Sequence, residues 1–286
     1  MVAVAGDVML DEYILGDADR ISPEAPNPVL SERERRSVPG GAANVAVNVN
    51  ALGARAFLVG AVGADPEGDA LRRGLAERGV AADGLVEVPG RPTTRKTRLI
   101  ARGSQLMRMD RETREPLGSI TAREVLRRLA SSPAKVVVIS DYAKGVVGPD
   151  LVGELVALGR KVIVDPKSSD FSRYANAFLV TPNLGELRAA TGRPDIGPDN
   201  LEAPARSLMD RFDIANLLVT LGPDGMALIE RGKPVLRVLT RAREVYDVTG
   251  AGDTVIATVA SSVAADAELE DACFVANIAE IGRAHV

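Results

Sequence analysis

Short apolar runs recur along the chain and are separated by longer amphipathic stretches. The runs are continuous rather than alternating, which is typical of strands buried on both faces, and they lie at residues 57–60, 136–139, 162–164, 178–180 and 217–219. Helical spacing of apolar residues predicts helices over 42–52, 69–78 and 121–130, the last with Thr121 as its cap. This alternation predicts an α/β fold with a mostly parallel sheet covered by helices on both faces.

Residues 29–37 and 95–111 break this rhythm, because polar and apolar side chains alternate there as in strands with one solvated face. We interpret both segments as one small sheet that projects from the main domain. Such a sheet could close over a substrate and exclude water. The alternative is a pair of ordinary surface hairpins.

Composition excludes several classes of function. The chain has 286 residues, 39 acidic and 35 basic, with a net charge of −4, so we expect one main domain, small soluble partners and no nucleic acid. Cys273 is the only cysteine and no apolar run approaches the roughly 20 residues that span a bilayer, which favours a cytoplasmic protein without membrane contact. His285 is the only histidine, so acid–base chemistry falls to carboxylates or lysines.

The most informative segment is DVTGAGDT at residues 247–254, which precedes the apolar run 255–259. The turn Gly250, Ala251 and Gly252 could point backbone N–H groups at an anion, and the dipole of a following helix favours the same charge. Asp253 could then accept the proton of an attacking hydroxyl. The alternative is a tight loop with Asp253 as a helix N-cap. Neither the P-loop pattern nor the dinucleotide-binding glycine pattern occurs, which disfavours both of those sites and an NAD-dependent oxidoreductase.

Two signatures in this order resemble those of the ribokinase-like (PfkB) carbohydrate kinases: PGGAANVA at 39–46 and the segment 247–254. The resemblance continues through TPNLGE at 181–186 and VTLGPDG at 219–225. It implies a Rossmann-like three-layer sandwich with a small β-sheet lid, and an enzyme that uses ATP with Mg²⁺ to phosphorylate a sugar hydroxyl.

Within the family, the chain most resembles the heptose 7-phosphate kinases, on the segments 6–11, 20–26, 105–110, 140–145 and 244–253. That likeness implies transfer of the ATP γ-phosphoryl group to the anomeric hydroxyl of D-glycero-β-D-manno-heptose 7-phosphate. The product would be the 1,7-bisphosphate, a precursor of ADP-heptose for the lipopolysaccharide core. The alternatives are another ribokinase-like sugar kinase and a non-catalytic sugar or nucleotide sensor on the same fold.

The resemblance also implies roles for individual residues on the sugar side. Asp11, Gly40, Gly41 and Asn44 match positions that hold sugar hydroxyls, although the glycines could simply form a turn and Asn44 a helix start. A phosphorylated sugar needs cations, and Arg108 is the preferred candidate, with Arg98 or Arg102 as alternatives; Arg108 could instead be a solvated charge on an edge strand. Asp141 and Lys144 follow a buried strand at its carboxyl end, where α/β sheets bind ligands.

On the nucleotide side, Lys167 could neutralise ATP phosphates. Asn183 and Glu186 match a motif that places Mg²⁺ and phosphate, often through water, although Glu186 would also suit the first turn of a helix. Asp247 and Thr249 match positions that in relatives help bind a monovalent cation, and K⁺ is the ion expected there. The remaining expected nucleotide contacts are Thr220, Gly222, Gly225 and Asn277.

The end of the chain departs from the family pattern. Residues 280–286 can be encoded by a common sequencing adapter, so we expect a non-native tail after a kinase domain over 1–279 that is truncated at its C-terminus. An exposed lid sheet could also pair across a two-fold axis, which predicts a homodimer through the lid.

Overall fold

A computed structural model describes residues 1–240 and 250–283 of the chain. A nine-stranded sheet forms the centre of these residues. The strand order is β13-β12-β11-β10-β9-β8-β1-β4-β5, parallel except where β12 pairs with β11 and β13. The strands that sequence predicted are present within a residue or two. These predicted strands are β4, β8, β9, β10 and β11. The bounds of all nine strands are β1 Val2–Gly6, β4 Ala56–Val62, β5 Leu85–Glu87, β8 Val136–Ser140, β9 Lys161–Asp165, β10 Leu179–Val180, β11 Asn216–Thr220, β12 Met226–Glu230 and β13 Leu236–Val238.

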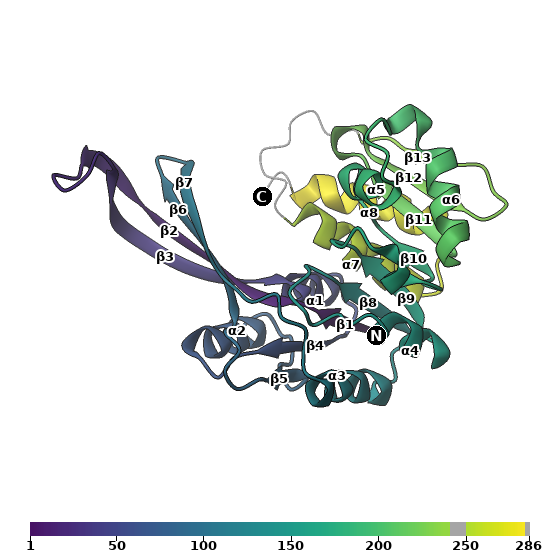
Figure 1. The fold of residues 1–286 in the computed structure, drawn as a ribbon, viewed down its shortest axis with the longest axis horizontal. Helices are drawn as coiled ribbons and strands as arrows, with labels where there is room; N and C mark the ends of the chain where they lie inside the picture. Colours follow the sequence, from purple (N-terminus) through teal and green to yellow (C-terminus); the bar gives the residue numbers. More distant parts are fainter. Residues whose placement is uncertain (241–249, 284–286) are drawn as a thin grey trace.

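Helices cover both faces of this sheet, which gives the expected three layers (Figure 1). One face packs against α1 Ala42–Ala51, α2 Pro66–Ala76, α7 Ala251–Ala264 and α8 Leu269–Arg283. The other face packs against α3 Ser119–Ser131, α4 Leu151–Ala157, α5 Leu184–Thr191 and α6 Glu202–Phe212. Strand residues alternate between the two cores, as in Val136 and Val138 on one face and Val137 and Ile139 on the other. Short 3₁₀ turns lie at Phe171–Tyr174, Pro198–Asn200 and Gly222–Asp224.

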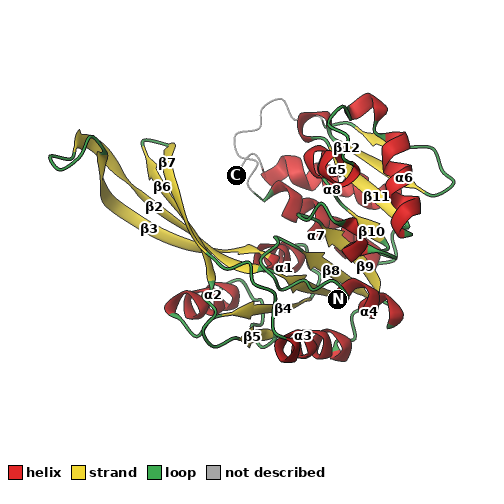
Figure 2. Cartoon of the chain, in the orientation of Figure 1, coloured by secondary structure: helices red, strands yellow, loops and turns green. Residues whose placement is uncertain are grey.

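The lid is a separate four-stranded sheet that extends away from the main body (Figure 2). Its strand order is β3-β2-β6-β7, with bounds β2 Val8–Ile21, β3 Pro28–Gly41, β6 Thr94–Ala101 and β7 Ser104–Arg111. The two predicted segments therefore belong to one sheet rather than to separate hairpins. The sequence analysis did not predict β2, because only its first residues, 8–10, are apolar and fully buried, whereas its second half is largely polar and more exposed.

Ion pairs fasten the base of the lid to the main domain. Glu67, in the first turn of α2, forms ion pairs with Arg95 of β6 at 2.5 Å and with Arg111 of β7 at 2.9 Å. Inside the lid, the buried Glu12 carboxylate accepts a hydrogen bond of 2.8 Å from Thr97. These contacts hold β6 and β7 beside the loops that carry the candidate site.

Helix α3 begins at Ser119 with Gly118 as its N-cap, so the predicted cap at Thr121 is wrong by one turn. Helix α8 continues through residues 281–283, and the last three residues lie outside the described part of the chain. No helix of the described residues is long and apolar enough to cross a membrane.

Candidate active site

Helix α7 begins at the predicted glycine turn. Gly250 is its N-cap with a φ of 77°, a left-handed conformation that suits glycine, and Ala251 and Gly252 form the first turn. A Cβ added to Gly252 would meet nothing within 4 Å, so the backbone there is open to a ligand. The backbone N–H groups of Ala251 and Gly252 and the dipole of this helix terminus favour an anion, and the anion hole expected from sequence stays a prediction.

Asp253 lies in that same first turn and is 4% exposed. Both of its carboxylate oxygens accept hydrogen bonds from side chains far away in the sequence. Asn44 of α1 donates from Nδ2 to Oδ2 at 2.6 Å, and Tyr142 donates from its hydroxyl to Oδ1 at 2.9 Å. The Asn44 interaction joins the two sequence signatures.

The loop after β8 is fixed by a buried aspartate at the end of β1. The Asp7 carboxylate accepts the backbone N–H groups of Tyr142, Lys144 and Val146 at 2.8, 3.0 and 3.1 Å. Burial raises the pKa of Asp7, although these three N–H donors oppose the rise. Asp7 thus fixes the backbone position of Tyr142 and Lys144 after the end of β8.

On the sugar side, Asp11 and Gly40 lie directly together at the base of the lid. A Cβ on Gly40 would come within 2.1 Å of an Asp11 carboxylate oxygen, so a side chain at this position would displace the Asp11 carboxylate. Gly41 follows with a φ of 58° and precedes α1, which carries Asn44. Asp11 also forms an ion pair of 2.6 Å with Arg98.

The candidate phosphate ligands differ in their surroundings. Arg108 is half-exposed and pairs with Asp110 at 2.9 Å, and Arg102 is exposed at the lid tip, where it pairs with Asp19. Lys144 is buried against Glu112 at 2.6 Å. Lys96 of β6, which sequence reasoning missed, forms no ion pair with any residue of 1–240 or 250–283.

Lys96 is partly buried, and its ammonium lies 5.4 Å from the centre of the Tyr142 ring. Burial lowers the pKa of Lys96, and the positive charges of Lys144 and Arg108 act in the same direction. Carboxylates of Asp11 and Asp110 oppose that change only partly. An added anion would relieve this excess of positive charge.

Asp141 is more enclosed than a sugar ligand needs to be. It is 1% exposed, and its carboxylate accepts the Tyr174 hydroxyl at 2.6 Å and the Ala143 N–H at 2.8 Å. In this arrangement the Asp141 carboxylate holds the backbone of the loop after β8 through the Ala143 N–H. Its expected contact with sugar stays a prediction.

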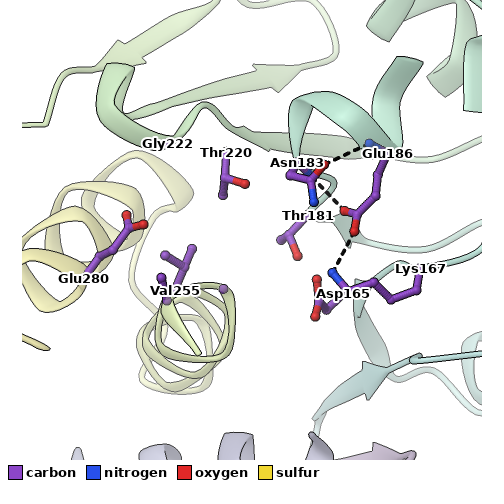
Figure 3. Close-up of a pocket in the computed structure, with 11 residues that line it drawn as sticks. Asp165, Lys167, Thr181, Asn183, Glu186, Thr220, Gly222, Val255 and Glu280 are labelled. Atoms are coloured by element: carbon purple, nitrogen blue, oxygen red, sulfur yellow. Dashed lines mark hydrogen bonds and ion pairs between the residues drawn. The ribbon is translucent and has the colours of Figure 1, made fainter. Parts of the chain in front are cut away.

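A pocket lies beside the N-terminus of α7 (Figure 3). Lys167 and Glu186 form an ion pair of 2.6 Å on one side of it, and Glu186 also forms a capping box with Asn183 at the start of α5. Thus the cap role and the ligand role of Glu186 involve the same carboxylate. The residues that line this pocket are Asp165, Lys167, Thr181, Asn183, Glu186, Thr220, Gly222, Ala251, Gly252, Val255 and Glu280.

Negative charge is concentrated near Lys167. The pKa of Asp165 is raised to about 7, chiefly by burial; the charge of Lys167 opposes this rise, and the charges of Asp253 and Glu186 contribute to it. Burial disfavours charge on Lys167 as well, but Asp165 and Glu186 outweigh that effect and raise its pKa. Lys167 therefore stays protonated and suits a polyphosphate.

Two expected nucleotide contacts do not line this pocket. A Cβ on Gly225 would meet the Val238 carbonyl oxygen at 2.0 Å, so this glycine allows β13 to approach. Asn277 is buried and links α8 to the segment after β13, through the Leu239 carbonyl at 3.1 Å and the Thr240 hydroxyl at 3.0 Å. Asp247 and Thr249, the expected cation ligands, lie outside the described residues.

Comparison with known proteins identifies the family of this chain. The family description "pfkB family carbohydrate kinase" matches residues 1–279. The chain is 46% identical over 280 residues to the bifunctional protein HldE of Shewanella sediminis, a match that covers 97% of this chain and 58% of that protein. The chain thus spans less than two thirds of the length of such relatives.

Solved structures share the fold. One is the tetrameric inhibited form of phosphofructokinase-2 from Escherichia coli, with a TM-score of 0.84 and 21% identity over 99% of this chain and 94% of that one. Another is ribokinase from Arabidopsis thaliana complexed with ribose and ATP, with a TM-score of 0.79 and 20% identity over 100% of this chain and 92% of that one. The expected ribokinase-like fold is confirmed. The chain belongs to the pfkB family of carbohydrate kinases, which transfer a phosphoryl group to a sugar hydroxyl.

Proposed function

We propose that this chain phosphorylates the anomeric hydroxyl of D-glycero-β-D-manno-heptose 7-phosphate with ATP to give the 1,7-bisphosphate. One observation carries the proposal: Asp253 is held by Asn44 and Tyr142 at a helix N-terminus that faces a polar pocket. The sequence similarity to HldE proteins supports the choice of sugar. Because the chain covers 58% of that relative, only the kinase half-reaction is proposed.

The cations at the lid base support a sugar that already carries phosphate. Lys96 has an ammonium without an ion-pair partner among the described residues, and Lys144 and Arg108 contribute positive charge to the same region. A phosphate would supply the missing negative charge. We therefore assign the distal phosphate to Lys96 first, with Lys144 and Arg108 beside it.

The pocket in Figure 3 suits the phosphates of ATP together with Mg²⁺. Lys167 supplies an ammonium, and Asp165 and Glu186 supply carboxylate oxygens, the ligand type that Mg²⁺ prefers. Both Glu186 oxygens already accept hydrogen bonds, from Lys167 and from the Asn183 N–H, which favours contact through water. Bound Mg²⁺ would neutralise charge on the phosphates. A monovalent cation near Asp247 and Thr249 stays a prediction.

In the proposed reaction, the anomeric hydroxyl transfers its proton to the Asp253 carboxylate. The sugar oxygen forms a bond to the γ-phosphorus, and the bond between that phosphorus and the ADP oxygen breaks. The N–H groups of Ala251 and Gly252 face the transferring group and stabilise its negative charge. The lid excludes water, which would otherwise compete with the sugar.

Coupled measurement of ADP release tests this function. We expect turnover with the heptose phosphate to exceed that with ribose or fructose 6-phosphate, and Asp253→Asn to reduce kcat by about 10³-fold or more. Asp271→Asn, an exposed aspartate in the first turn of α8, serves as the matched control. A preference for another sugar would reject the proposed substrate, and an active Asp253→Asn variant would reject the proposed base.

We also propose that two copies associate through their lids. Every residue of edge strand β7 is exposed, including Leu106, Met107 and Met109, and apolar side chains on an open strand favour pairing. Sedimentation at several concentrations tests this association. Met109→Arg should yield monomers, whereas a monomeric wild type would exclude the dimer.

A further inference from the structure

We propose that Tyr142 is a positioning residue that orients the Asp253 carboxylate to accept the proton of the sugar. This inference rests on the proposed function, in which Asp253 is the base. The Tyr142 hydroxyl donates to Oδ1 of Asp253 at 2.9 Å, while Asn44 holds Oδ2 at 2.6 Å. Because Asn44 and Tyr142 donate to different oxygens, the carboxylate cannot rotate without losing one of these hydrogen bonds.

The backbone around Tyr142 is fixed more firmly than an ordinary loop. Its N–H donates to the buried Asp7 carboxylate at 2.8 Å. The next residue, Ala143, has a φ of 55°, which is unusual for a residue with a side chain, and its N–H donates to Asp141 at 2.8 Å. The carboxylates of Asp7 and Asp141 therefore hold the backbone of residues 142 and 143, and so fix the orientation of the Tyr142 ring.

The Tyr142 ring touches both halves of the candidate site. The Lys96 ammonium, from the lid, lies 5.4 Å from the ring centre, and the Lys167 ammonium, from the pocket, lies 5.7 Å from it. Both distances fall within the range of cation–π attraction. The ring thus spaces the two cations, and the hydroxyl fixes the base.

The phenol itself is unsuited to act as the base. Burial raises the pKa of Tyr142 far above its ordinary value, and the charge of Asp253 adds to this effect. The hydroxyl therefore keeps its proton and remains a donor throughout the neutral range. Since that bond favours the ionised form of Asp253, its removal must raise the pKa of the carboxylate.

Tyr142→Phe removes the hydroxyl and keeps the ring, so it isolates this one hydrogen bond. We expect kcat to fall about 10- to 100-fold, with the KM values for ATP and sugar changed by no more than about two-fold. The acid limb of the pH–rate profile should move to higher pH by about one unit. A merely structural role would not move that limb.

Tyr174→Phe is the matched control, because it removes another tyrosine–aspartate bond, that to Asp141 at 2.6 Å. It should lower the melting temperature and leave the acid limb in place. If Tyr142→Phe does not fold, 3-fluorotyrosine at the same position keeps the size and makes the phenol a stronger donor. The limb should then move to lower pH.

The outcomes separate this inference from the function on which it rests. An unshifted acid limb in Tyr142→Phe or in the fluorotyrosine protein would overturn the positioning role of Tyr142. The proposed function would survive that result as long as Asp253→Asn is inactive. A rise in KM with kcat unchanged would also overturn it. If Asp253→Asn retains full activity, the proposed function fails, and the inference fails with it.

Discussion

The Nδ2 atom of Asn44 lies 2.6 Å from Oδ2 of Asp253, although 209 positions separate the two residues in the chain. Asn44 stands in α1, directly after the end of lid strand β3, whereas Asp253 stands in the first turn of α7. The two helices pack in the same core. The position of the candidate base therefore depends on the segment that joins the lid to the main domain.

Asn44→Ala removes one donor from the base, and Asn44→Asp places a second negative charge beside it. We expect the alanine variant to lose about 10-fold in kcat and the aspartate variant at least about 100-fold, because a like charge hinders ionisation of Asp253. Steady-state kinetics check both. Asn50→Ala, on the exposed end of the same helix, removes a bond to the Arg78 carbonyl instead. Equal losses in all three variants would contradict a specific role for Asn44.

Lys96 lies in lid strand β6, and Arg102 lies in the turn that follows it. Lys96 is partly buried whereas Arg102 is exposed, which allows a paired test. Lys96→Gln should raise the KM for the sugar phosphate by about 10- to 100-fold and leave the KM for ATP nearly unchanged, since a charged hydrogen bond to phosphate is lost. Arg102→Gln, whose exposed partner is Asp19, should change neither. Unaltered sugar affinity in Lys96→Gln would assign the phosphate to Arg108 or Lys144.

The central strands of the main sheet could be predicted from sequence, because each is marked by a short apolar run within its own segment. Continuous apolar runs such as 136–139 are buried on both faces and identify β8 without knowledge of its neighbours. The glycine turn likewise marks the start of α7 in a single segment. β2 escaped prediction because its pattern changes along its length, from a core strand near Val8 to a solvated lid strand near Ile21.

The residues that sequence reasoning missed depend on distant partners. Tyr142 stands at the end of a buried strand, so its place was a usable signal, but only the fold brings its hydroxyl to Asp253. Lys96 lies between Arg95 and Arg98, and nothing local distinguishes its ammonium from these paired guanidinium groups. Within the part of the chain that the structure describes, the packing of the lid decides which of these three neighbouring cations forms no ion pair.

Lys167 faces the pocket where ATP is proposed to bind. Lys167→Gln removes the ammonium that the carboxylates of Asp165 and Glu186 keep protonated. We expect the KM for ATP to rise about 10-fold or more with the sugar KM nearly unchanged, which isothermal titration with ATP can check in parallel. Lys161→Gln, an exposed lysine at the start of β9, is the control. A larger effect on sugar than on ATP would reverse the assignment of the two substrates.

Asp165 should make stability depend on pH. Burial raises its pKa from an ordinary 3.8 to about 7, so between these values the folded chain holds a proton that the unfolded chain has released. Because the folded state binds more protons there, the free energy of unfolding falls as the pH rises through this window. From pH 5 to pH 8 we expect the melting temperature of the wild type to drop by roughly 5–10 °C more than that of Asp165→Asn.

Asp170 provides the opposite case for comparison. Its pKa is lowered by hydrogen bonds from Ser172, so its contribution to stability is complete above its ordinary pKa and is lost only as the pH falls. Asp170→Asn should therefore lower the melting temperature by a constant amount from pH 5 to pH 8. Parallel curves for Asp165→Asn and the wild type would show that Asp165 is ionised in the folded protein throughout this range. In that case Lys167 compensates the charge of Asp165 fully, despite its burial.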